Sequence, residues 1–201
     1  GPGATNAITG ALCAWMDSIP MLVLSGQVRY DTTVRHSGLK IRTMGVQEYD
    51  ITPSVEPMTK YAVMVTDPLT IRYHLERAIY LAKTGRPGPC WLDLPLNVQS
   101  AIVETEELKA YDPSEDKKEL PAPVSEETVK NILEKLKQAS RPLLFAGHGI
   151  RLAGAYHEFQ HLVELLGIPV VTGMSSIDLM ESAHPLYVGR NGGTGNRPGN
   201  F

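Results

Sequence analysis

The sequence lacks the features that mark membrane, secreted and nucleic-acid-binding proteins. Its 201 residues include no run of about eighteen apolar residues that could span a bilayer. They also include no charged segment followed by an apolar stretch, the pattern of a secretory signal peptide. The formal net charge is -3 and the isoelectric point is near 6.1, so there is no electrostatic case for a nucleic acid or a membrane partner. We therefore expect a cytoplasmic protein that acts on small molecules.

Cysteine is scarce, and neither cysteine nor histidine follows a metal-ligand pattern. Cys13 lies in a predicted helix and Cys90 in a predicted strand, and their apolar surroundings predict buried thiols without a disulfide framework. His157 and His161 are four residues apart on a predicted helix, but no further ligand or general base accompanies them. We predict no metal site in this chain.

Predicted strands and helices alternate along the chain, and this alternation predicts an α/β fold of parallel sheets flanked by helices. Apolar runs predict strands at 21–24, 60–65, 90–94, 143–146 and 168–172. The first of these runs is continuous, as expected for a strand that is buried on both faces. The acidic, proline-punctuated stretch 104–123 is typical of a linker, so we predict parts of two successive three-layer domains, at 1–103 and 124–201.

Helical periodicity predicts which side chains face the sheets. Asp67 and Ser125 are predicted to cap the helices that follow them. The predicted buried positions are, for the first helix, Ile8, Leu12, Trp15 and Met16; for the helix after Asp67, Ile71, Leu75, Ala78, Ile79 and Ala82; and for the helix after Ser125, Val129, Ile132, Leu133 and Leu136.

The sequence opens on a glycine-bracketed turn, Gly1-Pro2-Gly3, that leads through Asn6 into a helix. Two glycines around a proline let the backbone turn tightly and expose its N–H and C=O groups, so that a flat ring can lie against the main chain. The same turn is also typical of an ordinary strand-to-helix connection. No strand precedes it in the sequence, and we expect the chain to begin and end within domains of a larger protein.

Six further strings follow the turn in order: 15–20 (WMDSIP), 25–28 (SGQV), 47–51 (QEYDI), 60–61 (KY), 85–89 (GRPGP) and 91–95 (WLDLP). Together they resemble the pyrimidine-binding domain of thiamine-diphosphate enzymes, in particular the acetolactate synthase large subunit. The resemblance is dense over about the first hundred residues. It continues by pattern into 124–201, which resembles the central, dinucleotide-fold-like domain of the same family.

The resemblance implies a carboligase or decarboxylase in which thiamine diphosphate acts as the electron sink for a 2-oxo acid. Pyruvate is the expected donor, branched-chain amino acid biosynthesis the expected pathway, and a homodimer or tetramer the expected assembly. The implied cofactor-binding residues are Gly1, Pro2, Gly3, Asn6 and Gln47, with Gln47 near the reaction centre. Gln27 either supports the same pocket or is a surface strand end.

Other family features have no counterpart in the sequence. The glutamate that activates the cofactor and the motif that holds magnesium and the diphosphate are absent, so we expect no catalytic residue, no magnesium ligand and no activity in this chain alone. Glu48 is not expected to replace the missing glutamate, because a carboxylate in such a loop is usually solvated or paired.

Two features leave alternative functions open. The stretch between Gln27 and Gln47 is longer and more basic than in acetolactate synthase, with Arg29, Arg35, His36, Lys40 and Arg42. A charged run is often a solvated face, but these cations also suit a substrate carboxylate or a phosphorylated acceptor. The alternative is then another thiamine-diphosphate lyase or transferase, as in glyoxylate carboligases or in sugar and secondary-metabolite pathways.

The second feature is the turn Gly147-His148-Gly149, which follows a predicted strand and precedes a helix. It lacks the third glycine of the dinucleotide fingerprint at the usual offset. Some members of the resembled family bind FAD in this domain and others bind nothing there. FAD is therefore a possible cofactor, and a non-catalytic FAD- or nucleotide-binding subunit is the third hypothesis.

Overall fold

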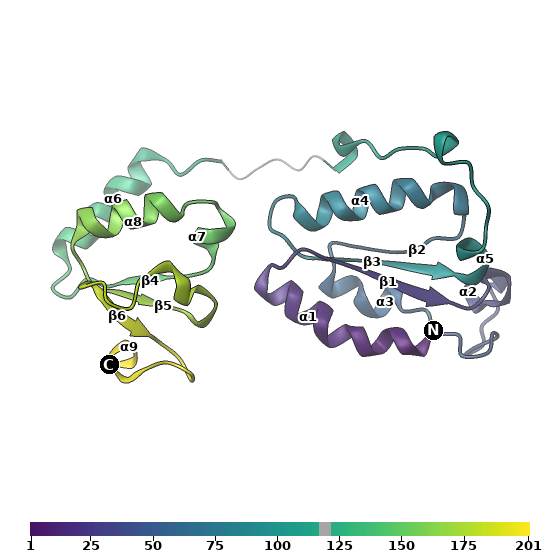
Figure 1. Ribbon diagram of the computed structural model, residues 1–201, viewed down its shortest axis with the longest axis horizontal. Coiled ribbons are helices and arrows are strands. Elements are labelled where there is room, and N and C mark those ends of the chain that lie inside the picture. Colours follow the sequence, from purple (N-terminus) through teal and green to yellow (C-terminus); the bar gives the residue numbers. More distant parts are fainter. Residues whose placement is uncertain (117–121) are drawn as a thin grey trace. The chain divides into compact units, whose positions relative to one another are not determined.

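The computed structural model describes residues 1–116 and 122–201. The chain forms two compact units, Gly1–Leu120 and Pro121–Phe201, and each contains a three-stranded sheet whose strands are all parallel (Figure 1). This confirms the predicted α/β fold of parallel sheets flanked by helices. In the described ranges no helix is both long enough and apolar enough to cross a membrane.

The sheet of the first unit has the strand order β1-β3-β2. Its elements are β1 (Met21–Gln27), β2 (Tyr61–Met64), β3 (Pro89–Pro95), α1 (Ile8–Asp17), α2 (Val34–Ser37), α3 (Thr52–Val55), α4 (Ile71–Lys83) and α5 (Leu96–Gln99). The central strand β3 is the buried one, with Trp91 and Leu92 fully inaccessible. The prediction that 21–24 is buried on both faces is wrong, because β1 lies at the edge and Leu24 is 54% exposed.

Helices cover both faces of this sheet (Figure 1). Alternate residues of β3 point to opposite faces, so Cys90 and Leu92 pack with Ala78 of α4, whereas Trp91 packs with Ala11 of α1 on the other side. The buried state of Cys90 confirms its prediction as a core thiol. Because Trp91 and Asp93 are two residues apart on β3, the Asp93 carboxylate shares the face that Trp91 occupies.

The buried face of α1 differs from the predicted one. Ala11 and Ala14 are the buried residues of this helix, since small side chains let it approach the sheet closely. Three predicted core residues are exposed instead: Leu12 (41%), Trp15 (41%) and Met16 (66%). Cys13 is also exposed, so its prediction as a buried thiol is wrong.

The start of α4 follows the predicted capping pattern. The Asp67 side chain accepts a hydrogen bond from the Leu69 backbone N–H at 3.0 Å, and Pro68 opens a short 3-10 turn that leads into α4. Ala78 and Ala82 are buried as predicted, but Ile79 is 49% exposed, so its placement on the buried face is wrong.

The sheet of the second unit has the order β4-β5-β6. Its elements are β4 (Leu144–Ala146), β5 (Val170–Thr172), β6 (Tyr187–Arg190), α6 (Glu126–Gln138), α7 (Gly149–Leu152), α8 (Tyr156–Leu166) and α9 (Arg197–Asn200). The core lies between this sheet and α8, where Val163 and Phe159 pack on Val170 and Ala146.

The helix α6 has its predicted cap but not its predicted burial. The Ser125 Oγ accepts a hydrogen bond from the Thr128 N–H at 3.2 Å, which confirms the cap. None of the described residues of α6 is buried, and Val129, Ile132 and Leu133 are all exposed. The prediction that they face a core is therefore wrong, because the described core of this unit is made by α8 and the strands.

The first part of the predicted linker has specific contacts with α4. Arg77 of α4 donates two hydrogen bonds to the Asp116 carboxylate, at 2.7 and 2.9 Å, and the Tyr111 hydroxyl donates to the same carboxylate at 2.8 Å. The Arg77 guanidinium also lies over the Tyr61 ring, 4.6 Å from its centroid. These contacts fix the chain along α4 up to Asp116; residues 117–121 of the predicted linker lie outside the described residues.

Candidate functional site

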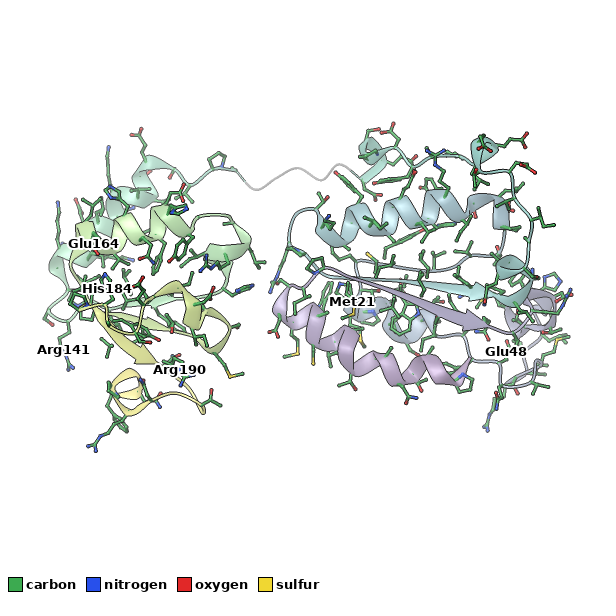
Figure 2. The ribbon with its side chains drawn as sticks, in the orientation of Figure 1. Met21, Glu48, Arg141, Glu164, His184 and Arg190 are labelled. Atoms are coloured by element: carbon green, nitrogen blue, oxygen red, sulfur yellow. The ribbon has the colours of Figure 1, made fainter. Side chains whose placement is uncertain are left out.

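A cavity lies at the carboxyl ends of β1 and β3, where parallel sheets usually place their ligands. Its volume is about 590 Å³, and it is lined by the opening turn, the end of β1, the 46–47 segment, Trp91 and Leu96. Figure 1 shows the N-terminus beside the arrowheads of these strands. In Figure 2 Glu48 lies at this edge and Met21 at the opposite end of β1.

The structure brings four of the five predicted cofactor-binding residues to this cavity. Gly1, Pro2, Gly3 and Gln47 line it, as does Gln27. Asn6 is exposed on the 3-10 helix Pro2–Ala7 and is not among the lining residues that the structure describes. The pocket thus joins two strings that lie far apart in the sequence.

Gly1 and Gln47 meet closely. A Cβ atom at Gly1 would lie 2.5 Å from the Gln47 carbonyl oxygen, so only glycine fits without a shift. Gln47 itself has φ 59°, in the left-handed region that few residues other than glycine adopt. Its side chain is exposed at the cavity, which leaves its amide available for a ligand.

The floor of the cavity contains a buried polar network that the sequence did not reveal. The Asp93 carboxylate, which is 0% exposed, accepts hydrogen bonds from Ser25 Oγ at 2.6 Å and from Gln27 Nε2 at 3.0 Å. Trp91 Nε1 donates to Ser25 Oγ at 2.8 Å. Burial raises the pKa of Asp93 above its ordinary value, and the two hydrogen bonds from Ser25 and Gln27 act in the opposite direction.

Gln27 also connects this network to the loop that carries Gln47. Its Nε2 donates a second hydrogen bond, at 2.5 Å, to the carbonyl oxygen of Tyr49. Its Oε1 accepts from the Val28 N–H at 3.1 Å. Gln27 is 5% exposed, so of the two predicted roles, pocket support and surface strand end, its burial favours the first.

Glu48 anchors the loop from its other side. Its Oε1 accepts from the Val34 N–H at 2.6 Å, and its Oε2 accepts from the N–H groups of Met44 and Gly45 at 2.8 and 3.1 Å. Burial raises the pKa of Glu48, but the three backbone hydrogen bonds outweigh it and hold the pKa below its ordinary value. The Glu48 carboxylate is thus paired with backbone donors, which is the reason given for expecting that it does not replace the missing glutamate.

Two arginines of the basic stretch bind carboxylates of the chain itself. Arg29 pairs with Asp31 at 2.9 Å and Arg35 with Asp50 at 2.6 Å. Lys40 and Arg42 are exposed. None of the basic residues of this stretch is among the described lining residues of the cavity. Arg29 and Arg35 therefore shape the 29–50 segment through these ion pairs.

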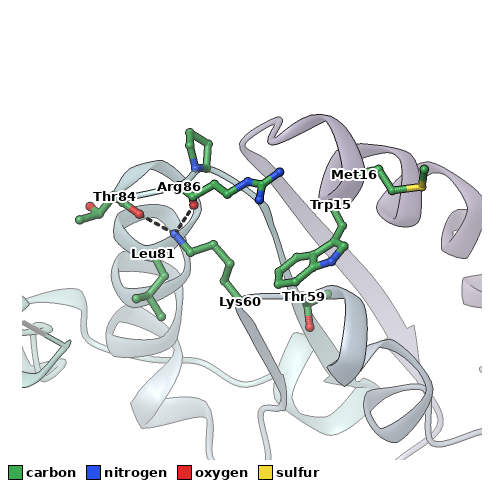
Figure 3. A pocket seen from close by; sticks show the side chains of 9 residues that line it. Trp15, Met16, Thr59, Lys60, Leu81, Thr84 and Arg86 are labelled. Carbon is green, nitrogen blue, oxygen red and sulfur yellow. Dashed lines mark hydrogen bonds between the residues drawn. The ribbon is translucent and has the colours of Figure 1, made fainter. Parts of the chain in front are cut away.

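A second cavity, of about 560 Å³, lies at the opposite, amino-end edge of the same sheet (Figure 3). Residues of two further strings, 60–61 and 85–89, line it and have a structural role there. Lys60 Nζ donates to the carbonyl oxygens of Thr84 and Arg86 at 2.5 and 2.9 Å, and Arg86 Nε donates to Ser18 Oγ at 2.7 Å. A Cβ at Gly88 would lie 3.2 Å from Lys60 Cδ. Lys60 and the 85–89 string thus secure the end of α4.

The Gly147-His148-Gly149 turn lies at the carboxyl end of β4. An added Cβ at either glycine would meet no described atom within 4 Å, so packing does not require glycine there. The Nδ1 atom of His148 is buried and has no hydrogen-bond partner among the described residues. At the end of β6, where Figure 2 labels Arg190, the Arg190 N–H donates to Asn196 Oδ1 at 3.0 Å.

Comparison with known protein families agrees with this geometry. Residues 1–48 match a family model described as the N-terminal TPP-binding domain of thiamine pyrophosphate enzymes, and residues 129–201 match the model of their central domain. This chain belongs to the thiamine pyrophosphate enzyme family. The first match contains both the opening turn and Gln47, and the second contains the Gly147–Gly149 turn.

Three curated relatives of this thiamine pyrophosphate enzyme chain are acetolactate synthase large subunits. The chain is 38% identical over 197 residues to the acetolactate synthase large subunit of Corynebacterium glutamicum, covering 96% of this chain and 29% of the relative. It is 34% identical over 207 residues to the same subunit of Lactococcus lactis, and 33% identical over 201 residues to isozyme 1 of Escherichia coli, in each case covering 100% of this chain and 33% of the relative. The chain therefore spans about a third of the length of these relatives.

Proposed function

We propose that this chain is part of a thiamine-diphosphate-dependent carboligase or decarboxylase of the acetolactate synthase type, with pyruvate as donor. The observation that carries the proposal is the contact between the Gly1–Gly3 turn and Gln47 across one cavity at the carboxyl edge of the first sheet. Relatives named acetolactate synthase at 33–38% identity support the same reaction class.

The residues present suit the pyrimidine end of the cofactor. Gly1 carries no side chain where its Cβ would meet the Gln47 carbonyl, so the Gln47 loop can lie against the opening turn. At Gly3, which lines the cavity, an added Cβ would meet no described atom within 4 Å, so a flat ring can approach the backbone of the turn there. Gln47, with its exposed amide, and Asn6, on the adjoining 3-10 helix, would supply hydrogen-bonding groups to that ring. When bound, thiamine diphosphate supplies an electron sink for decarboxylation of a 2-oxo acid.

The proposal assigns no magnesium site to the described residues. Among them there is no group of three or more His, Cys, Asp or Glu side chains that could hold a metal ion.

Self-association as a homodimer or tetramer also belongs to the proposal. The exposed Leu12, Trp15 and Met16 of α1 supply an apolar surface for it.

A second ligand, FAD or another nucleotide, is proposed for the carboxyl edge of the second sheet. The observation that favours it is the buried Nδ1 of His148, between the two glycines of the turn, which has no hydrogen-bond partner among the described residues, because a buried polar atom without a partner is rare in native proteins. Loading the chain with FAD and recording its visible absorbance tests this point. Absence of bound flavin at millimolar FAD would remove the proposal.

Calorimetric titration of the chain with thiamine diphosphate tests the main proposal. We expect measurable binding by the unsubstituted chain. Gln47→Ala should bind about tenfold more weakly, because it removes the amide that would form a hydrogen bond with the cofactor. Lys40→Ala, an exposed change in the same segment, is the control and should leave the affinity unchanged. No binding by the unsubstituted chain, or equal losses in both variants, would contradict the proposed pocket.

The reaction itself is tested on the protein purified from its source cells. Pyruvate should be converted into acetolactate and carbon dioxide. A product that incorporates glyoxylate or a sugar phosphate instead would assign the chain to another thiamine-diphosphate lyase or transferase, and turnover of no 2-oxo acid would point to the non-catalytic subunit.

A further inference from the structure

We propose that Asp93, acting through Gln27, is a positioning residue that holds the Gln47 loop (residues 44–50) at the cavity. The buried Asp93 carboxylate accepts a hydrogen bond from the Gln27 amide, and the same amide donates to the Tyr49 carbonyl oxygen in the loop. We call the chain of contacts from Asp93 through Gln27 to the Tyr49 carbonyl the relay. The importance of the loop rests on the proposed function, whereas the relay rests on contacts within the first unit.

The first step is the location of Asp93. It is fully buried in β3, the central strand, between the buried residues Leu92 and Pro95 and close to Trp91. A carboxylate in such a place is costly unless donors meet both of its oxygens. Ser25 Oγ meets Oδ1 and Gln27 Nε2 meets Oδ2, so Asp93 acts as the acceptor of two donors from β1.

The second step is that these contacts fix the orientation of the Gln27 amide. Its Nε2 faces the acceptor atoms Asp93 Oδ2 and Tyr49 O, and its Oε1 faces the Val28 N–H, a donor. A flipped amide would set oxygen against oxygen and nitrogen against N–H, and all three hydrogen bonds would be lost. Asp93 thereby keeps the N–H groups of Gln27 directed at the loop.

The third step is the effect on the loop. Tyr49 lies two residues after Gln47, and the Glu48 carboxylate between them accepts from the Val34 N–H outside the loop and from the Met44 and Gly45 N–H groups within it. The Val34 contact ties the loop to α2, while the Gln27 contact ties it to β1 and through Asp93 to β3. Gln47, in its left-handed conformation, is thus held from two sides against Gly1.

A purely structural role for Asp93 makes a different prediction, and Ser25 separates the two. Ser25 donates to the same carboxylate as Gln27, but none of its described hydrogen bonds reaches the loop. If Asp93 only stabilises the sheet, removing its acceptor atoms should raise exchange in the loop no more than Ser25→Ala does at an equal loss of stability. If Asp93 positions the loop through Gln27, removing its acceptor atoms should raise loop exchange as Gln27→Met does.

The experiment is amide hydrogen exchange by NMR on the full chain. In Gln27→Met and in Asp93→Leu, the Glu48 amide, which donates to Gly45 O, should exchange about tenfold faster. Leucine is similar in shape to aspartate but has no acceptor atom, so Asp93→Leu leaves Gln27 Nε2 without its partner in β3. The double variant should be no faster than the faster single variant, because both changes break one relay.

Two control variants distinguish positioning of the loop from a general loss of stability. Ser25→Ala removes the other donor, and Val65→Ala opens a cavity in the cluster that packs on α4; both should lower stability and change Glu48 exchange by less than about twofold. Exchange that rises in all four variants in proportion to their loss of stability would overturn the relay. Unchanged exchange in Gln27→Met would overturn it as well, even if Asp93→Leu does not fold.

Titration of the same variants with thiamine diphosphate connects the relay to the cofactor pocket. We expect Gln27→Met to weaken binding about as much as Gln47→Ala does, and Ser25→Ala to weaken it less. If the unsubstituted chain binds no thiamine diphosphate while the exchange pattern holds, the proposed function fails and the relay stands. If binding occurs and the exchange pattern fails, the relay alone is wrong.

Discussion

The central strands of the two sheets each carry one polar residue that is completely buried, Asp93 in β3 and Thr172 in β5. Thr172 Oγ1 is satisfied within its own sheet by the hydroxyl of Tyr187 on the neighbouring strand, at 3.0 Å. Asp93 takes its two donors from β1, and one of these, Gln27, reaches on to the loop at Tyr49. A buried hydroxyl can thus be satisfied locally, whereas a buried carboxylate needs several donors and connects distant segments.

The largest effect is expected from Asp93→Ala. It leaves the donors of Ser25 and Gln27 without their charged acceptor, and we expect the first unit to lose about 2–3 kcal/mol in free energy of unfolding. The chain has two tryptophans, Trp15 and Trp91, both within the first unit, so urea unfolding followed by tryptophan fluorescence reports on this unit. A loss below about 1 kcal/mol would show that the network contributes no more than an ordinary hydrogen bond.

The matched change in the second unit is Thr172→Val, which keeps the shape of the side chain and removes its hydroxyl. We expect a loss of about 1 kcal/mol, the usual worth of one buried hydrogen bond. Tyr187→Phe removes the other partner, and the double variant should cost less than the sum of the two single changes. Thermal unfolding followed by circular dichroism measures all three, and a cost equal to that of Asp93→Ala would remove the contrast between the sheets.

The two carboxylates near the cavity are expected to respond to pH in opposite directions. The folded pKa of Asp93 is raised above its ordinary 3.8, so the first unit should lose stability as pH rises from 3.8 through that folded pKa. The folded pKa of Glu48 is lowered below its ordinary 4.5, so its contribution is complete above pH 4.5 and is lost as pH falls through the folded pKa.

Urea unfolding of three proteins across this pH range checks the signs. Asp93→Asn should remove a component of stability that falls with rising pH, and Glu48→Gln should remove a component that rises with it. If both variants changed the slope of unfolding free energy against pH in the same direction, the environments of Asp93 and Glu48 would not differ in the way the structure indicates.

The smallest effect is expected at the amino-end edge of the first sheet. Lys60→Met keeps the aliphatic stem but removes the donor to Thr84 O and Arg86 O, and because both contacts are exposed to solvent we expect a cost of about 0.5 kcal/mol in free energy of unfolding. Exchange of the amides near Thr84 should rise while exchange of Glu48 stays unchanged. Lys83→Met, at the exposed last residue of α4, is the control, and faster exchange at Glu48 in Lys60→Met would show that the two edges are coupled.

Apolar runs predicted the strands β1 to β5 but not β6, and caps predicted the helix starts at Asp67 and Ser125, because these signals are local in the sequence. Local periodicity could not tell that β1 lies at the sheet edge or that α1 approaches the sheet through Ala11 and Ala14, since both depend on the order of strands. The opening turn and Gln47 were predicted from the family resemblance. Nothing local in the sequence marks Asp93 within the 91–95 string, because its donors Ser25 and Gln27 are 68 and 66 residues away.

The contacts of Arg77 with Asp116 have a mechanical consequence. The covalent chain leaves β3 at Pro95 and reaches the second unit only after Asp116. Tension along the backbone from the second unit would load the paired hydrogen bonds of Arg77 and Asp116 before it reached β3. The load would pass into α4, and the carboxyl end of β3, with Asp93 and the Gln47 loop, would be shielded from the pull.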